Sequence, residues 1–122
     1  MRALVVDDSA VMRKVLIGAL QRADITEVDQ AGDGVEAVNA VEQHDYGVVL
    51  MDWNMPNMLG IDAVREIRAK GKKMPIIMVT TEAEKSRVVD ALKAGANNYV
   101  IKPFEPATIV HKIQEVLAKT GG

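Results

Sequence analysis

The sequence predicts an α/β fold with one five-stranded parallel sheet that carries helices on both faces. Short apolar runs rich in β-branched residues recur along the chain, and each is typical of a buried strand. The segments between these runs space their apolar residues at helical intervals, and turns containing glycine or proline separate the two kinds of segment. Strands that alternate with helices in this way form a parallel sheet covered on both sides.

Each expected strand is bounded by polar or turn-forming residues. Pro75 opens the fourth strand, and the second strand has the weakest pattern of the set. The five strands are expected at residues 3–6, 26–30, 47–51, 76–80 and 99–101.

The helices are identified by apolar side chains at i, i+3 and i+4 spacing. After Asp8 this pattern comprises Met12, Val15, Leu16, Ala19 and Leu20. Four later segments, around residues 35–41, 61–67, 83–94 and 107–118, are also expected to be helical. Gly95 follows the fourth of the five helices, and we expect it to adopt the left-handed conformation that ends many helices.

Length and composition limit the possible functions. The 122 residues suit a single domain, expected to span 1–122 with no output domain. The net charge of −2 gives no support for nucleic-acid binding. Cysteine is absent, so disulfides, thiolate metal sites and cysteine nucleophiles are excluded. The first residues hold no apolar run long enough for a signal sequence or a membrane span, so we expect a cytoplasmic protein.

Acidic residues close two of the expected strands. Asp7 and Asp8 follow the first strand, and Asp52 follows the third. Right-handed crossovers leave few strand orders, and the flavodoxin-like order 2-1-3-4-5 places strands one and three side by side where ligands bind. Three carboxylates would then converge, and at roughly 4 Å and an effective dielectric near 20 each pair repels by about 4 kcal/mol. Such a cluster indicates a bound cation.

Three further polar residues fall at the same edge of the expected sheet. Thr80 ends the fourth strand, Lys102 ends the fifth, and Asn54 lies two residues past Asp52. Mg²⁺ prefers oxygen ligands, and phosphoryl transfer mainly needs in-line positioning and neutralisation of the phosphoryl oxygens. With Lys102, Thr80 and a metal on those oxygens, Asp52 is free to act as the nucleophile and form an aspartyl-phosphate.

Taken singly, each of these residues has an ordinary structural interpretation. Asp7 or Asp8 would suit the N-cap of the first helix. Thr80 alone would bond local backbone, Lys102 alone would be a solvated lysine, and Asp52 alone would be a turn residue. Their coincidence at one sheet edge favours a phosphoryl site over these separate interpretations.

Four motifs resemble the receiver domains of bacterial two-component response regulators over essentially the full chain. They are VVDDS at 5–9, LMDWNMPNMLG at 50–60, MVTTEAE at 78–84 and AGANNYVIKPF at 94–104. The resemblance implies a (βα)5 receiver fold. Within the family the stand-alone chemotaxis regulators are the most similar, because Trp53, Asn54, Glu82 and Tyr99 fall at their counterparts' positions.

The resemblance also implies a role for each site residue. Asp52 would accept the phosphoryl group. Mg²⁺ would be bound by Asp7, Asp8, Asp52 and the backbone carbonyl of Asn54, with Asp8 the most direct ligand. Thr80 and Lys102 would contact the phosphoryl group. The Lys102–Pro103 bond would be cis, and cis peptide bonds occur almost only before proline.

Two further roles concern the lifetime of the phosphorylated state and its readout. Asn54 and Glu82 occupy the positions that tune how fast water removes the phosphoryl group. An inward movement of Thr80 would leave space beside the fifth strand for the ring of Tyr99. Entry of the ring into this space would change the surface formed by the fourth helix, the fifth strand and the fifth helix. Without the resemblance, Tyr99 would be interpreted as a rim aromatic whose hydroxyl faces water.

Two residues depart from the family pattern. Leu59 stands where an acid is common, which gives the loop after Asp52 an apolar tip and leaves partner contacts through that loop open. Thr81 follows Thr80 where a small residue is usual, and its bulk would narrow access to Asp52.

The expected function is therefore a phosphorylation switch and not an enzyme with a separate substrate. Expected partners are a histidine kinase, a phosphatase, and either a flagellar motor switch protein or, in the alternative role of phosphorelay shuttle, a phosphotransfer protein. We expect a monomer that binds neither nucleic acid nor membrane.

Two alternatives come from other functional classes. A Mg²⁺-dependent phosphatase of the haloacid dehalogenase type, working through an aspartyl-phosphate, would need Asp-x-Asp after the first strand, whereas Asp7 and Asp8 are adjacent. A flavodoxin-type FMN carrier would share the fold alone. The aromatic content of 3% and the lack of a hydroxyl- and glycine-rich loop after Val6 weigh against it.

Overall fold

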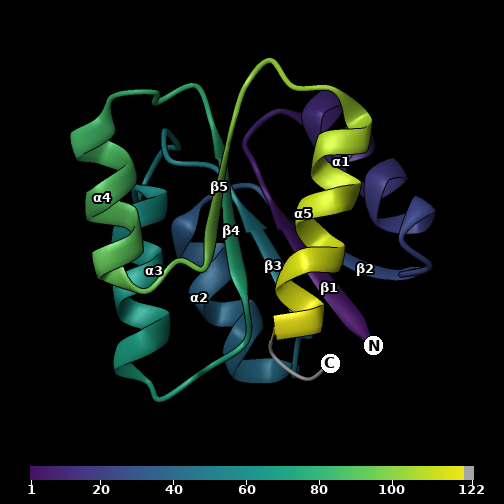
Figure 1. Ribbon diagram of the computed structural model, residues 1–122. Coiled ribbons are helices and arrows are strands. Elements are labelled where there is room, and N and C mark those ends of the chain that lie inside the picture. The colour runs from purple at the N-terminus through teal and green to yellow at the C-terminus, as the bar shows by residue number, and fades with distance from the viewer. Residues whose placement is uncertain (120–122) are drawn as a thin grey trace.

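Ten helices and strands alternate strictly along residues 1–119, the part of the chain that the computed structural model describes (Figure 1). The strands are β1 (Arg2–Val6), β2 (Glu27–Ala31), β3 (Val48–Met51), β4 (Ile76–Thr80) and β5 (Asn98–Ile101). The helices are α1 (Ala10–Arg22), α2 (Gly34–Gln43), α3 (Gly60–Ala69), α4 (Lys85–Ala94) and α5 (Pro106–Lys119). Residues 120–122 of the expected 1–122 domain lie outside the described part.

The five strands form one parallel sheet in the order β2-β1-β3-β4-β5, as the sequence predicts. The central strands β1, β3 and β4 are apolar and almost fully buried, which is the pattern of strands covered on both faces. Strand β2, at one edge, is mostly polar and only partly buried, which explains its weak sequence signal.

Helices α1 and α5 cover one face of the sheet, and α2, α3 and α4 cover the other (Figure 1). The core is correspondingly divided into two apolar clusters, one on each side of the sheet. Alternate residues of each central strand serve the two clusters. In β1, for example, Leu4 and Val6 face α2 and α3, whereas Ala3 and Val5 face α1 and α5. Within residues 1–119, no helix combines the length and apolar character needed to cross a membrane.

The expected boundaries agree with the structure to within one or two residues. Gly95 has a φ of +121°, so the expectation of a positive φ after α4 is correct. The Lys102–Pro103 peptide bond is cis, as the resemblance implies. Helix α4 begins at Lys85 and not at 83, because the backbone N–H of Glu82 donates to the Thr80 hydroxyl outside the helix.

Candidate functional site

The order of the sheet brings Asp7 and Asp52 to the same edge. Val6 and Met51 are register partners in the neighbouring strands β1 and β3, so the next residue of each strand lies at their shared carboxyl end. The Asp52 N–H donates to the Val6 carbonyl at 2.9 Å, which extends the pairing by one residue. The Asp7 N–H donates to the Ala31 carbonyl of β2 at 3.1 Å. Both acids are therefore fixed by backbone hydrogen bonds.

Asp8 joins these two acids. One carboxylate oxygen from each of Asp7, Asp8 and Asp52 lies within 4.8 Å of the others. Asp7 is 1% exposed and Asp52 is 7% exposed, whereas Asp8 faces solvent. Oxygen donors from two buried acids and one exposed acid fit a hard divalent ion such as Mg²⁺, which binds few protein carboxylates and keeps several waters.

Lys102 provides the positive charge beside this cluster. Its ammonium donates to Asp7 Oδ2 at 2.7 Å and to Asp52 Oδ2 at 3.2 Å. Burial acts to lower the pKa of Lys102, but the hydrogen bond to Asp7 and the charges of Asp52 and Asp7 outweigh it, so the pKa is raised. Lys102 is therefore a charged ion-pair partner of both acids and not the solvated lysine of the alternative interpretation.

Burial dominates the electrostatics of Asp52. Removal from water raises the pKa of its carboxyl group, Lys102 lowers it, and Asp7 raises it further, with a net upward shift. Asp52 Oδ1 accepts a hydrogen bond from the Trp53 N–H at 2.7 Å. The charged form of Asp52 is thus held in a buried position that disfavours it.

The residue that caps α1 is Ser9. Its hydroxyl accepts a hydrogen bond from the Met12 N–H at 3.2 Å, and Asp7 Oδ1 accepts one from the Ser9 N–H at 2.9 Å. The alternative interpretation of Asp7 or Asp8 as the helix cap is therefore wrong. Because Ser9 satisfies the helix end, the carboxylate of Asp8 is left for the cluster.

Thr80 lies at the end of β4 and is completely buried. Its hydroxyl accepts a hydrogen bond from the Glu82 N–H at 3.3 Å, and its carbonyl accepts one from the Lys102 N–H at 2.9 Å. These bonds tie the end of β4 to the end of β5. Thr80 bonds local backbone, as its ordinary interpretation requires, and also stands at the same edge as Lys102.

Two residues from neighbouring segments donate hydrogen bonds to Glu82. Its side-chain Oε2 accepts a hydrogen bond from Asn54 Nδ2 at 3.2 Å, and its backbone carbonyl accepts one from the Tyr99 hydroxyl at 2.6 Å. Burial, followed by the nearby negative charge of Glu82, raises the pKa of Tyr99 to about 12. The interpretation of Tyr99 as a rim aromatic with its hydroxyl in water is therefore wrong, because that hydroxyl is bonded within the protein.

Sequence reasoning did not identify Arg87 as a neighbour of the site. Its guanidinium carbon lies 5.4 Å from the centroid of the Trp53 ring, and its Nε lies 3.6 Å from Glu82 Oε1. Glu82 and Arg87 are five positions apart and Glu82 precedes α4, so no helical spacing indicates the pair. The ring of Trp53 belongs to a buried residue, which is only 3% exposed.

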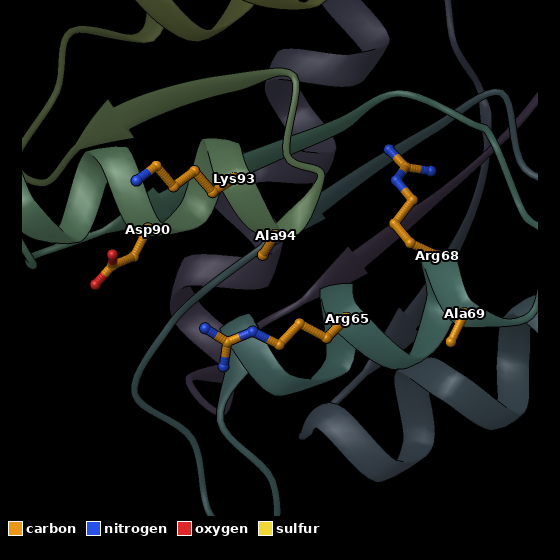
Figure 2. Close-up of a pocket in the computed structure, with 6 residues that line it drawn as sticks. All are labelled: Arg65, Arg68, Ala69, Asp90, Lys93 and Ala94. Atoms are coloured by element: carbon orange, nitrogen blue, oxygen red, sulfur yellow. The ribbon is translucent and has the colours of Figure 1, made fainter.

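A separate depression of about 540 Å³ lies between the C-terminal halves of α3 and α4, and its lining does not include Asp7, Asp8 or Asp52 (Figure 2). Figure 2 shows the Arg68 guanidinium turned away from the ends of Arg65 and Lys93. The Arg68 guanidinium donates to the carbonyls of Lys72 and Gly95. The charged groups of this depression do not converge, and Arg68 links the segments that follow α3 and α4.

With this geometry established, comparison with known proteins assigns the chain to a family. It belongs to the response regulator receiver domain family, which matches residues 3–114. The fold is that of CheY-like receiver domains, a class of signalling switches.

Two curated relatives illustrate the similarity. A chemotaxis protein CheY homolog of Campylobacter jejuni is 46% identical over 125 residues, covering 100% of this chain and 96% of the relative. Chemotaxis protein CheY1 of Helicobacter pylori is 46% identical over 120 residues, covering 96% of this chain and 97% of the relative.

Two solved structures have the same fold as this chain. Chemotaxis protein CheY4 of Vibrio cholerae superposes with a TM-score of 0.86 at 34% identity, over 94% of this chain and 97% of that one. A CheY-like receiver domain protein of Methanospirillum hungatei gives a TM-score of 0.89 at 30% identity, over 97% of this chain and 94% of that one.

Proposed function

We propose that Asp52 accepts a phosphoryl group from a CheA-like histidine kinase in a Mg²⁺-dependent reaction, and that the phosphorylated protein controls the flagellar motor. One observation carries the chemical part of this proposal. Asp52 is a buried carboxylate that shares a pocket with two other acids and accepts a hydrogen bond from Lys102.

Asp7, Asp8, Asp52 and the backbone carbonyl of Asn54 would hold the metal, which supplies positive charge to the phosphoryl oxygens when bound. One oxygen of Asp52 attacks phosphorus, the new O–P bond forms, and the N–P bond of the phosphohistidine breaks with its electron pair passing to the histidine nitrogen. Lys102 is placed to move from Asp52 Oδ2 onto a phosphoryl oxygen, because its ammonium already bonds that carboxylate. The Thr80 hydroxyl donates to another such oxygen.

Loss of the phosphoryl group restores the carboxylate. Water attacks phosphorus, the bond to the Asp52 oxygen breaks, and inorganic phosphate leaves. Asn54 and Glu82 tune this step, and their hydrogen bond at 3.2 Å links the loop after β3 to the loop after β4. The reaction is self-catalysed and turns over no separate substrate, although a phosphatase is an expected partner.

The output passes through the face formed by α4, β5 and α5. A phosphoryl group shifts the equilibrium between two conformations only if it interacts differently with them. Thr80 would provide that difference, and Tyr99 would transmit it through the Glu82 carbonyl. The exposed apolar side chains Val89 and Leu92 on α4 and Ile101 on β5 give this face the character of a protein-binding surface.

The relatives named as chemotaxis proteins favour the flagellar motor switch protein as the output partner over the phosphotransfer protein of a phosphorelay. We expect a cytoplasmic monomer that spans residues 1–122 as a single receiver domain.

Labelling with acetyl phosphate and Mg²⁺ tests this function. Intact-mass measurement should show one added phosphoryl group on the native protein and none on Asp52→Asn, whereas the matched surface variant Asp45→Asn should label normally. The labelled native protein should be retained by a motor switch protein and not by a phosphotransfer protein. A phosphoryl group that persists on Asp52→Asn would place the acceptor elsewhere.

A further inference from the structure

Arg87 links α4 to the edge of the Asp52 pocket. It lies in the first turn of α4, its guanidinium covers the buried ring of Trp53, and its Nε lies 3.6 Å from Glu82 Oε1. Trp53 directly follows Asp52 and donates its N–H to that carboxylate. Arg87 therefore touches both the residue next to Asp52 and the acid at the edge of the pocket.

The two oxygens of Glu82 have different partners. Oε2 accepts a hydrogen bond from Asn54, and Oε1 is paired with Arg87. The carboxylate is thus held between the loop after β3 and the first turn of α4. Without Arg87, Asn54 alone would hold it, and one side of the carboxylate would be free to turn.

The charge balance gives Arg87 a second effect. Asp7, Asp8 and Asp52 place three negative charges in the pocket, which Lys102 and the Mg²⁺ of the proposed reaction would offset together. Glu82 adds a further negative charge beside Asn54, in the loop that follows Asp52. Small phosphoryl donors are anions, so an unpaired Glu82 would repel them on their approach.

We propose that Arg87 is a positioning residue for phosphoryl acceptance: it fixes the Glu82 carboxylate against Asn54 and offsets its charge, so that anionic donors reach Asp52. This rests on the proposed role of Asp52 as the acceptor. Nothing in the chemistry of the pocket requires Arg87 to touch the phosphoryl group, because its guanidinium lies over Trp53.

The structure separates this role from a purely structural one. The side chains of Arg87 and Glu82 are 48% and 30% exposed, and ion pairs this open to solvent contribute little to folding. The effect of their charges on an approaching anion is a rate effect, and salt reduces it. Loss of the Arg87 charge should therefore change phosphorylation kinetics far more than the melting temperature.

The test measures rates of phosphorylation with Mg²⁺ for the native protein and for Arg87→Gln, Arg87→Lys, Glu82→Gln and the double variant Glu82→Gln/Arg87→Gln. Two donors are used, acetyl phosphate and phosphoramidate, because acetyl phosphate is the more negatively charged at neutral pH. Arg87→Gln should slow phosphorylation by acetyl phosphate about three- to ten-fold. The effect should be smaller on phosphorylation by phosphoramidate, and smaller for either donor at high salt. Arg87→Lys should react at nearly the native rate, because the charge remains.

The double variant supplies the decisive comparison. In the Glu82→Gln background, Arg87→Gln should have almost no effect on the rate, because no negative charge is left to offset. The proposal would be overturned if Arg87→Gln lowered the phosphorylation rate equally in both backgrounds, lowered it equally with both donors, or did not lower it. Failure of Arg87→Gln to fold would also overturn it, since that would assign Arg87 to packing on Trp53. Failure of the proposed function looks different, because the native protein would then acquire no phosphoryl group.

Discussion

At the scale of single residues, the site combines burial with opposing charge. Asp7 and Asp52 are almost completely enclosed at the carboxyl ends of β1 and β3, and the Lys102 ammonium lies between them. One ammonium cannot offset two buried carboxylates and the adjacent Asp8. Burial is the largest cause of the net upward shift in the pKa of Asp52, and Asp7 adds to it while Lys102 opposes it, so the ionised carboxylate costs folding free energy.

Replacement of Asp52 should therefore stabilise the metal-free protein. A group whose folded-state pKa is raised stabilises the fold at low pH, and this contribution is lost as pH rises through the folded pKa. At neutral pH Asp52→Asn should raise the free energy of unfolding by about 1 kcal/mol, because the amide keeps the bond from Trp53 but carries no charge. Urea denaturation at several pH values measures this difference in the free energy of unfolding.

The gain from Asp52→Asn should shrink as the pH falls toward the range where the native carboxyl group is protonated. The exposed Asp45→Asn should show neither the gain nor this pH dependence. A loss of stability in Asp52→Asn at neutral pH would mean that the Lys102 pair outweighs burial.

Which residues the sequence could reveal follows from how each one is positioned. Thr80 is the last residue of β4, and three further site residues directly follow strands: Asp7, Asp52 and Lys102. The strand order alone therefore predicts that all four lie at one edge of the sheet. Ser9 and Arg87 depend on local turns and side-chain conformation. The sequence could have indicated Ser9 as the helix cap, because serine is a favoured N-cap residue and Met12, the first apolar residue of the helical pattern, follows three positions later. Arg87 had no such signal.

At the scale of secondary-structure elements, the start of α3 fixes the backbone of Asp52. The Gly60 N–H donates to the Trp53 carbonyl at 2.8 Å, and a Cβ on Gly60 would lie only 1.7 Å from the Asp52 carbonyl oxygen. The helix thus approaches the backbone of Asp52 as closely as glycine allows. This contact accounts for a glycine at the first position of α3 despite its poor helix propensity.

Gly60→Ala should lower the free energy of unfolding by about 3 kcal/mol, because backbone must move to admit the methyl group. Gly18 in α1 is a matched control, since a Cβ there would meet nothing within 4 Å. Gly18→Ala should raise stability by about 1 kcal/mol through helix propensity. Chemical denaturation of both variants measures their free energies of unfolding. Equal changes in the two variants would show that α3 does not constrain Asp52.

Sequence patterns placed the elements well but not their exact starts. The apolar periodicity of α4 predicts a helix from 83, yet the backbone of Glu82 bonds Thr80 and Tyr99, and α4 begins at Lys85. The hydroxyl of Tyr99 was misplaced in water in one interpretation for the same reason. Both depend on which tertiary hydrogen bonds the loop between β4 and α4 makes, and residue spacing does not encode these.

At the scale of the whole molecule, the fold followed from alternation and handedness. Buried parallel strands, helices on two faces and right-handed crossovers restrict the topology, and the observed order β2-β1-β3-β4-β5 is the one expected. That order alone places β1 beside β3 and so gathers acids that lie about 45 residues apart in the chain. The acid cluster is thus a consequence of global topology, and the chemistry proposed for it depends on all three acids holding one ion.

Isothermal titration of the metal-free protein with Mg²⁺, paired with melting curves, tests that dependence most directly. The native protein should bind one ion, and millimolar Mg²⁺ should raise its melting temperature by mass action. Asp8→Asn should be more stable than the native protein without metal and should lose both the binding heat and the shift, whereas the surface control Asp62→Asn should retain them. Absence of Mg²⁺ binding by the native protein, or undiminished binding by Asp8→Asn, would contradict a shared magnesium site.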